Sequence, residues 1–201
     1  MKKITLSISF LFLLFITTTA QVTIKPHVGM NFSLFTEDPI DYDDPGVRVG
    51  VLLGLGAKFG EDFYIEPAVQ YGGSTYELVH ANNPDQDFNA IFRGLRIPVS
   101  FGYQFGDNDD LFRFRLFAGP SATIMFDVEV ESGSNAQGLP KSEDFNTIIW
   151  GANMGLGLDV WFLYLETGYD IGLSNVYNGE SSFDVGKNNM FWFALGVNIG
   201  G

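Results

Sequence analysis

The sequence contains no cysteine, which excludes both a disulfide framework and the lipid-modified cysteine that anchors a lipoprotein. Basic residues are also scarce, because 11 Lys and Arg stand against 24 Asp and Glu and leave a formal net charge of -13. Such an acidic balance disfavours nucleic acid as a partner. The apolar run from Ile4 to Ile16 is too short for a transmembrane anchor helix, and no stop-transfer charges follow it.

The first twenty residues instead have the composition of a secretory signal peptide. Met1-Lys2-Lys3 is a basic start, the apolar run forms the core, and Thr17 to Ala20 is a small-residue stretch suited to cleavage before Gln21. We therefore expect a signal peptide at 1–20 and one β-barrel domain at 21–201. Cleavage removes two lysines and no acids, so the formal charge moves from -13 to -15.

Eight stretches of the chain alternate apolar residues with small or polar ones at a period of two. This pattern is typical of β-strands, whose side chains point alternately to opposite faces. The clearest stretch runs from Val47 to Phe59, with Val, Leu, Ala and Phe on one face and Arg48, Lys58 and glycines on the other. The other seven stretches are 22–34, 63–73, 91–105, 111–127, 148–160, 162–174 and 190–199.

The composition of the two faces indicates which one points outward. A soluble barrel would expose a surface made largely of glycines and would crowd its many bulky apolar residues into a narrow lumen. With the faces reversed, Leu, Val, Ile and Phe contact hydrocarbon and the small residues line the lumen. Aromatics gather near one set of strand ends, as in an interfacial girdle. The sequence therefore predicts an all-β, eight-stranded antiparallel up-and-down transmembrane β-barrel.

The predicted connections are of two kinds, as in outer-membrane barrels. Those at Gly60-Glu61-Asp62, at Gly106 to Asp110 and around Trp161 are short, whereas 35–46, 77–89, 128–146 and 175–189 are long and polar. We expect the protein in the outer membrane of a Gram-negative cell, with short turns and both termini periplasmic and the long loops extracellular.

Several charged residues fall on the lumen face. Charges in a low-dielectric lumen must pair or remain hydrated. Counted from the short turns, five of them lie at similar depth and predict an ion-pair cluster: Lys58, Glu66, Arg113, Arg115 and Glu166. We expect Arg96 and Asp170 to pair, directly or through water, nearer the middle. A structural role is favoured over an ion or proton path, because barrels of this size are filled by side chains.

No pattern in the sequence predicts catalysis. The two histidines are His80, in an acidic loop, and His27, on the lumen face, and no motif positions a nucleophile beside either. We therefore expect a non-enzymatic protein without a cofactor.

The predicted loops are strongly acidic. Asp41, Asp43 and Asp44 form a candidate divalent-cation site that would bind Ca²⁺ weakly, although the full spacing of an EF-hand is missing. Bridging ions, or Arg93 directly, are candidates for contact with the phosphates of lipopolysaccharide. Solvated loops kept soluble by their charge are the simpler interpretation.

Two segments resemble one known family. Arg96-Ile97-Pro98-Val99 with Gly102-Tyr103-Gln104-Phe105 resembles the central strand of the PorT-like outer-membrane β-barrels of Bacteroidota. Tyr164-Leu165-Glu166, Gly168-Tyr169 and Gly172-Leu173-Ser174-Asn175 are similar to the penultimate strand of that family. The resemblance implies a barrel of OmpA/OmpX-like build, mostly without assigned activity, and one namesake group serves type IX secretion and gliding.

Two functions follow as expectations. The first is a non-enzymatic barrel with a filled lumen that stabilises the envelope or presents its loops to a partner. The alternative is an accessory component of a type IX secretion or gliding-type envelope complex. In that alternative, loop aromatics such as Tyr42, Phe88 and Tyr177 would be docking points for an envelope protein.

Overall fold

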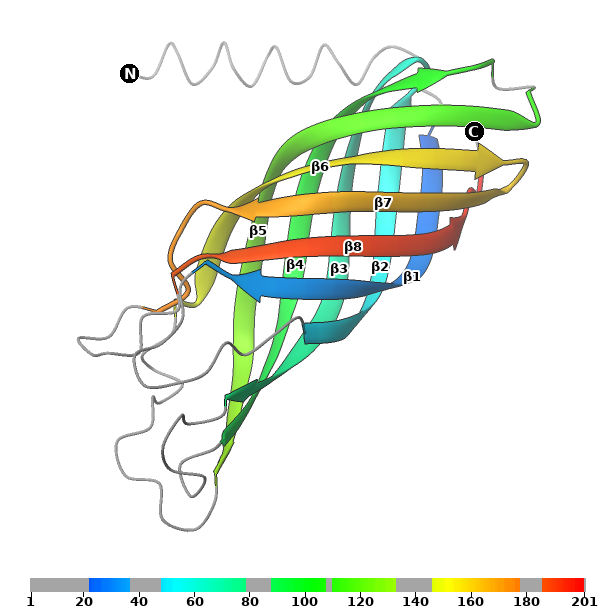
Figure 1. The fold of residues 1–201 in the computed structure, drawn as a ribbon. Helices are drawn as coiled ribbons and strands as arrows, with labels where there is room; N and C mark the ends of the chain where they lie inside the picture. Colours follow the sequence, from blue (N-terminus) through cyan, green and yellow to red (C-terminus); the bar gives the residue numbers. More distant parts are fainter. Residues whose placement is uncertain are drawn as a thin grey trace, which may run out of the picture.

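The computed structural model describes residues 22–36, 48–78, 88–107, 110–132, 146–177 and 186–200. In these ranges eight strands form one closed barrel (Figure 1), in which every neighbouring pair is antiparallel and β1 closes the sheet against β8. The predicted fold class is therefore confirmed. The strands are β1 Val22–Phe35, β2 Arg48–Gly60, β3 Phe63–Leu78, β4 Phe88–Phe105, β5 Phe112–Ser132, β6 Ile148–Val160, β7 Leu163–Gly172 and β8 Asn188–Val197.

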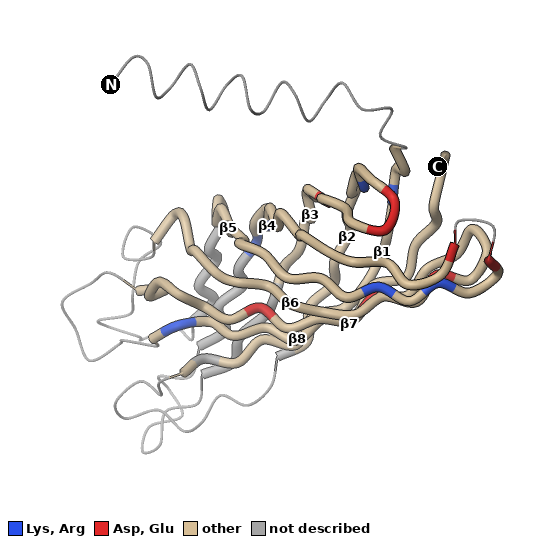
Figure 2. Tube along the Cα trace, turned by 90° about the horizontal axis from the view of Figure 1, so that it is seen from above, with Lys and Arg blue, Asp and Glu red and all other residues tan. Residues whose placement is uncertain are grey.

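The side chains of each strand alternate between the outside and the lumen. On β2, Val51 is 71% exposed and Leu53 60% exposed, whereas Leu52 between them is 4% exposed and points inward. The same alternation places Lys25, Glu66 and most other polar side chains of the strands inside. Few positions along the described strands carry a charged residue (Figure 2). The barrel therefore has an apolar exterior and a polar core.

The strands near the long connections extend further than the sequence pattern predicts. β4 begins at Phe88 and β5 ends at Ser132, and the two remain in register there, with Phe88 opposite Ser132. The expected loops 77–89 and 128–146 were thus too long. On β5 the alternation itself continues through Val128 and Val130, but the acidic residues between them suggested a loop, and the ladder persists because pairing needs only the peptide groups. A bulge between Arg93 and Gly94 shifts the register of this pair.

The opposite end of the barrel carries three tight turns and is called here the short-turn end. Gly60 and Gly106 adopt positive φ values of 109° and 98° beside two of these turns, and Trp161 adopts a φ of 58° in the third. Aromatic rings surround this end, and Phe63 and Trp161 are 80% and 71% exposed. Phe63, Tyr103, Phe105 and Phe114 contact one another in sequence around the rim. The predicted aromatic belt is present.

The other end, from which the four long connections leave, is called here the long-connection end. Much of those connections and residues 1–21 lie outside the described residues, and so does the expected signal peptide. Within the described ranges, no helix is long and apolar enough to cross a membrane.

Candidate functional site

Charged side chains of five strands meet inside the barrel near the short-turn end. Lys25 Nζ donates to the two carboxylate oxygens of Glu66 at 2.9 and 2.8 Å and to Glu166 Oε1 at 2.5 Å. Arg115 Nη2 donates to Asp159 Oδ1 at 2.8 Å, and its Nη1 lies 2.7 Å from Glu166 Oε1. These five residues, Lys25, Glu66, Arg115, Asp159 and Glu166, are called the lumenal ion cluster.

Glycines make room for these long side chains. Gly157 on β6 lies opposite Arg115 on one side and Glu166 on the other in the sheet register. A Cβ atom at Gly157 would stand 2.9 Å from Arg115 Nη2 and 3.2 Å from Glu166 Cγ. The alternation of glycine with long charged residues on the lumen face is therefore a packing requirement, because neighbouring strands are only about 5 Å apart.

The charges in the cluster nearly balance. Three carboxylates face the two cations Lys25 and Arg115, and Arg113 Nη2 adds a third cation 3.7 Å from Asp159 Oδ2. Lys25 and Arg115 are both 0% exposed. Buried charges without partners are destabilising by several kcal/mol, so mutual pairing is the condition under which this group stays ionised inside the barrel.

Two tyrosines lie against the cluster. Lys25 Nζ is 4.2 Å from the centroid of the Tyr164 ring, and the Arg115 guanidinium carbon lies 5.5 Å from the same ring and 6.0 Å from that of Tyr64. Both rings are almost completely buried. Cations over ring faces gain electrostatic attraction when water is excluded. The tyrosines and the ion cluster together fill the cross-section of the lumen here.

The five residues expected to form one cluster are only partly brought together. Glu66 and Glu166 both contact Arg115, and Arg113 lies at the edge beside Asp159. Lys58 was wrongly included, because its Nζ donates to Gln104 Oε1 at 2.7 Å while Glu66 is bound by Lys25 and Arg115. Lys25 and Asp159 were missed. The alternation of side chains along their strands places both residues on the lumen face. Counting residues from the short turns did not select them as members of the cluster.

A neutral hydrogen-bonded chain follows the cluster toward the middle of the barrel. His27 Nδ1 lies 3.0 Å from the Tyr164 hydroxyl and 3.1 Å from the carbonyl oxygen of Lys25, and its Nε2 lies 3.0 Å from Gln70 Nε2. Gln70 Oε1 accepts a hydrogen bond from Arg96 Nη1. The Gln70 amide group must then donate to His27 Nε2, so His27 is neutral with its proton on Nδ1.

Arg96 and Asp170 form a second ion pair above this chain. Arg96 Nε donates to Asp170 Oδ2 at 2.7 Å, and Ser121 Oγ donates to Asp170 Oδ1 at 2.8 Å. The Arg96 guanidinium also lies 5.5 Å from the Trp192 ring. The pairing is direct, which is one of the two arrangements considered from the sequence.

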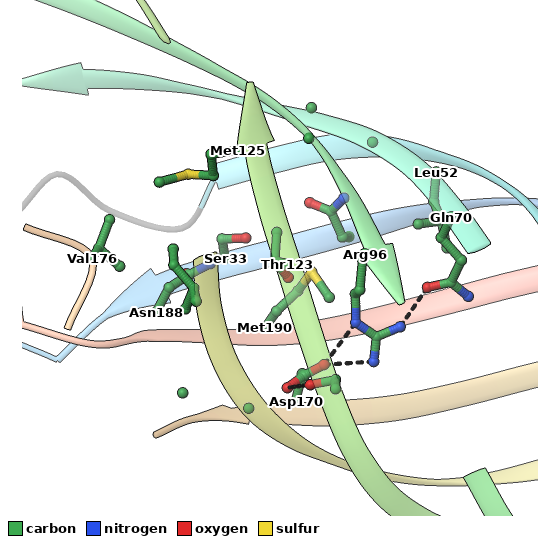
Figure 3. Close-up of a pocket in the computed structure, with 18 of the residues that line it drawn as sticks. Ser33, Leu52, Gln70, Arg96, Thr123, Met125, Asp170, Val176, Asn188 and Met190 are labelled. Carbon is green, nitrogen blue, oxygen red and sulfur yellow. Dashed lines mark hydrogen bonds and ion pairs between the residues drawn. The ribbon is translucent and has the colours of Figure 1, made fainter. Parts of the chain in front are cut away.

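A cavity of about 100 Å³ lies beyond this pair, toward the long-connection end. Figure 3 shows Arg96, Asp170 and Gln70 on one side of it, with Met125, Val176 and Asn188 on others. A smaller space of about 20 Å³ lies on the other side of Arg96, near His27 and Glu166. The larger of these two spaces therefore lies toward the long-connection end.

Other residues singled out in the sequence lie elsewhere. Asp41, Asp43, Asp44, Tyr42 and His80 are outside the described residues. Arg93 is partly buried beside the bulge and is among the residues that line the large cavity. Among the described residues, no group of three or more His, Asp or Glu side chains is placed to hold a metal ion.

The position of Tyr177 differs from the expectation. It was expected as an exposed docking aromatic, but it is 8% exposed and packs with Ile149 and Val176 in a small apolar cluster. Its neighbour Val176 makes the backbone hydrogen bonds that place both residues, donating to Gly186 O and accepting from Asn146 N, each at 2.9 Å. Composition alone suggested a loop, whereas this pairing turns the segment inward. The side chain of Phe88 lies outside the part of the chain that the structure describes.

Comparison with known proteins agrees with this architecture. The family model described as outer membrane protein beta-barrel domain matches residues 18–178. The chain belongs to this family. Membership places the barrel in the outer membrane, where its exposed Val, Leu, Ile and Phe side chains face hydrocarbon and its charges face the lumen.

Solved structures match the chain at low sequence identity. The outer membrane protein OprG from Pseudomonas aeruginosa is 15% identical, with a TM-score of 0.55, and the match covers 90% of this chain and 96% of that chain. The N-terminal β-barrel domain of Pseudomonas aeruginosa OprF is 16% identical, with a TM-score of 0.41, over 90% of this chain and 100% of that chain. No curated protein sequence matches the chain.

Proposed function

We propose that this outer-membrane protein is a closed, non-enzymatic barrel that stabilises the envelope and holds its long connections in place for contact with partners. The observation that carries the proposal is the lumenal ion cluster between Tyr64 and Tyr164. Ions moving along the axis would have to displace charges that are already paired at 2.5 to 2.9 Å. A lumen filled in this way favours a structural role over passive transport.

Conductance in planar lipid bilayers tests the closed state. We expect no stable conductance steps from the wild-type protein, whereas Tyr64→Ala combined with Tyr164→Ala removes two buried rings and raises conductance. Tyr71→Ala is the matched control, because Tyr71 is 45% exposed on the outer face and leaves the lumen unchanged. Stable steps of the wild-type protein would contradict the proposal. A gel shift between boiled and unboiled samples shows that each variant is folded.

The proposed orientation has the short turns and both termini in the periplasm and the long connections outside the cell. The support is the asymmetry between turns such as Glu61-Asp62 and the long polar segments. The absence of cysteine allows a direct test with single-cysteine variants. A membrane-impermeant maleimide should label Asp43→Cys on intact cells, but Asp62→Cys only after the cells are broken. The reverse labelling pattern would overturn the orientation.

The resemblance to the PorT-like barrels of Bacteroidota supports a second candidate, an accessory role in a type IX secretion or gliding-type complex. The buried position of Tyr177 removes one of its three docking aromatics. Purification from native membranes, followed by mass spectrometry, distinguishes the candidates. A stoichiometric envelope partner that is lost on Tyr42→Ala favours the accessory role. A barrel that purifies alone favours the structural role.

Ligands of the outer rim are also part of the proposal. Asp41, Asp43 and Asp44 are proposed to bind Ca²⁺ weakly, and ions held there to bridge to lipopolysaccharide phosphates, whereas Arg93 lines the cavity inside the barrel. Their support is the residue chemistry alone. Calorimetric titration with millimolar Ca²⁺ tests the first contact, with Asp41→Asn/Asp43→Asn as the matched control. Equal, flat titrations of both proteins would refute it.

A further inference from the structure

The cavity at the long-connection end has a mixed wall. Its polar lining residues are the Arg96–Asp170 pair, Arg93, Gln70, Asn31, Ser33 and Asn188, and its apolar lining residues are Leu52, Met125, Ile149, Val176 and Met190. The wall residues come from all eight strands or from the segments that join them, because the strands converge on this volume. A cavity that combines convergent polar groups with apolar walls has the general composition of a small-molecule site.

Two buried polar atoms of this wall have no hydrogen-bond partner among the described residues: Arg96 Nη2 and Asn188 Oδ1. Arg96 Nη2 lies 2.5 Å from Asp170 Oδ2 as an ion pair, but the hydrogen bonds to Asp170 and Gln70 are made by Nε and Nη1. Buried polar groups in native proteins are normally satisfied, so Asn188 Oδ1 needs a donor, and Arg96 Nη2, which already contacts Asp170, has a second hydrogen that it can donate to a further acceptor. One is a donor and the other an acceptor.

The charges of the wall restrict the chemistry of that partner. Arg96 is neutralised by Asp170, and Arg93, the other cation among the wall residues, also has an interaction partner, so a carboxylate would meet the like charge of Asp170 beside cations that are already engaged. An ammonium group would meet the guanidinium of Arg96. A neutral head group that both accepts from Arg96 and donates to Asn188 avoids both repulsions. Amides and alcohols have this property.

The volume restricts the size of the partner. An apolar cavity of about 150 Å³ holds benzene, so about 100 Å³ suits a molecule of roughly five or six non-hydrogen atoms. The apolar side chains Leu52, Met125 and Met190 would pack on its hydrocarbon part. The wall is partly preformed, because the backbone at Val176 is hydrogen-bonded to Gly186 and Asn146.

We propose that this cavity binds a small uncharged molecule that has an amide or hydroxyl head and a short branched aliphatic body. The head contacts Arg96 and Asn188, and the body lies against Leu52, Met125 and Met190. Binding leaves the ion cluster below undisturbed, so the site is separate from the closed part of the lumen.

Ligand-observed NMR on the folded barrel in lipid nanodiscs tests the proposal. The probe is isobutyramide, which has six non-hydrogen atoms, and the matched probe is isobutyrate, which has the same shape and a negative charge. Empty nanodiscs give the background from partition into lipid. We expect saturable binding of isobutyramide, with isobutyrate weaker by about tenfold or more. Absence of saturable isobutyramide binding would show a water-filled space only, and equal saturable binding of both probes would overturn the inference of an uncharged head group.

Three variants locate the bound probe. Thr123→Phe fills the cavity from β5 and should abolish binding, whereas Ile124→Phe, on the opposite face of the same strand, should not. Asn188→Leu keeps the side-chain size and removes the acceptor, so it should weaken isobutyramide binding several-fold. A gel-shift assay identifies folded samples, and Asn188→Leu decides the question if Thr123→Phe does not fold. Unchanged binding in Asn188→Leu and in folded Thr123→Phe would overturn the proposal.

Discussion

Replacing Lys25 by methionine should be among the most destabilising single changes in the barrel. Lys25 is 0% exposed, and its ammonium group contacts three carboxylate oxygens of Glu66 and Glu166 within 2.9 Å. Methionine has a similar length but leaves both carboxylates with Arg115 as their remaining cation within the lumenal ion cluster. Removing one partner from a buried ion pair costs about 3–5 kcal/mol, and we expect a loss of this size for Lys25→Met.

The same reasoning predicts that a second substitution compensates. Glu166→Gln in the Lys25→Met background removes one charge of each sign and restores the balance of the cluster. The double variant should therefore be more stable than the sum of the two single losses predicts, by about 0.5–3 kcal/mol. This coupling separates an electrostatic role of Lys25 from a role in packing, since packing losses would add.

Equilibrium urea unfolding of the protein in lipid vesicles, followed by tryptophan fluorescence, measures these free energies. Lys187→Met is the matched control, because Lys187 is exposed at the long-connection end and its replacement should leave the unfolding free energy unchanged. The reasoning is refuted if Lys25→Met unfolds at the wild-type urea concentration, or if the double variant loses the full sum of the single losses.

Three further predictions concern the two faces of the barrel. Leu55→Arg places a charge on the exposed face near the middle of β2 and should lower the unfolding free energy in vesicles by about 2–4 kcal/mol, with a smaller loss for Val49→Arg nearer the strand end. Unfolding free energies of both variants equal to that of the wild-type protein would contradict a lipid-facing surface. Gly196→Val forces a side chain against a buried tyrosine ring and should abolish the gel shift of the folded barrel; a retained shift would show that the lumen can adapt. In single-tryptophan variants, brominated acyl chains should quench Trp150, which is 58% exposed, but not Trp192, which is 3% exposed; equal quenching would show that the faces are misassigned.

Much of the barrel is predictable from the sequence because strand side chains alternate strictly. The parity of each stretch identifies Leu52 as a lumen residue despite its apolar character, and it places Lys25 and Asp159 inside as well. The length of the strands is less predictable. β5 continues to Ser132 although the acidic residues after Phe126 suggested a loop, because Val128 and Val130 maintain the alternation and the peptide groups still pair with β4.

The pairing of charges inside the lumen was predicted only in part. Lys58 and Lys25 are both inward-facing lysines on adjacent strands, and the sequence contains no feature that distinguishes them. Their roles differ because Lys25 and Arg115 reach Glu66 across the lumen and saturate it, after which Lys58 contacts Gln104. The inward turn of Tyr177 likewise depends on hydrogen bonds between segments far apart in the chain.

The sequence by itself determined the number of strands, their antiparallel order and the face that each side chain occupies, since all three follow from local alternation and from short connections. Only the tertiary structure decided which lumen charges meet, where the lumen is filled, and where a cavity of about 100 Å³ remains. These features depend on the relative register of eight strands closed into a ring and on the reach of long side chains across it. Interactions across the lumen join residues as distant as Lys25 and Glu166, and no local pattern encodes such a contact.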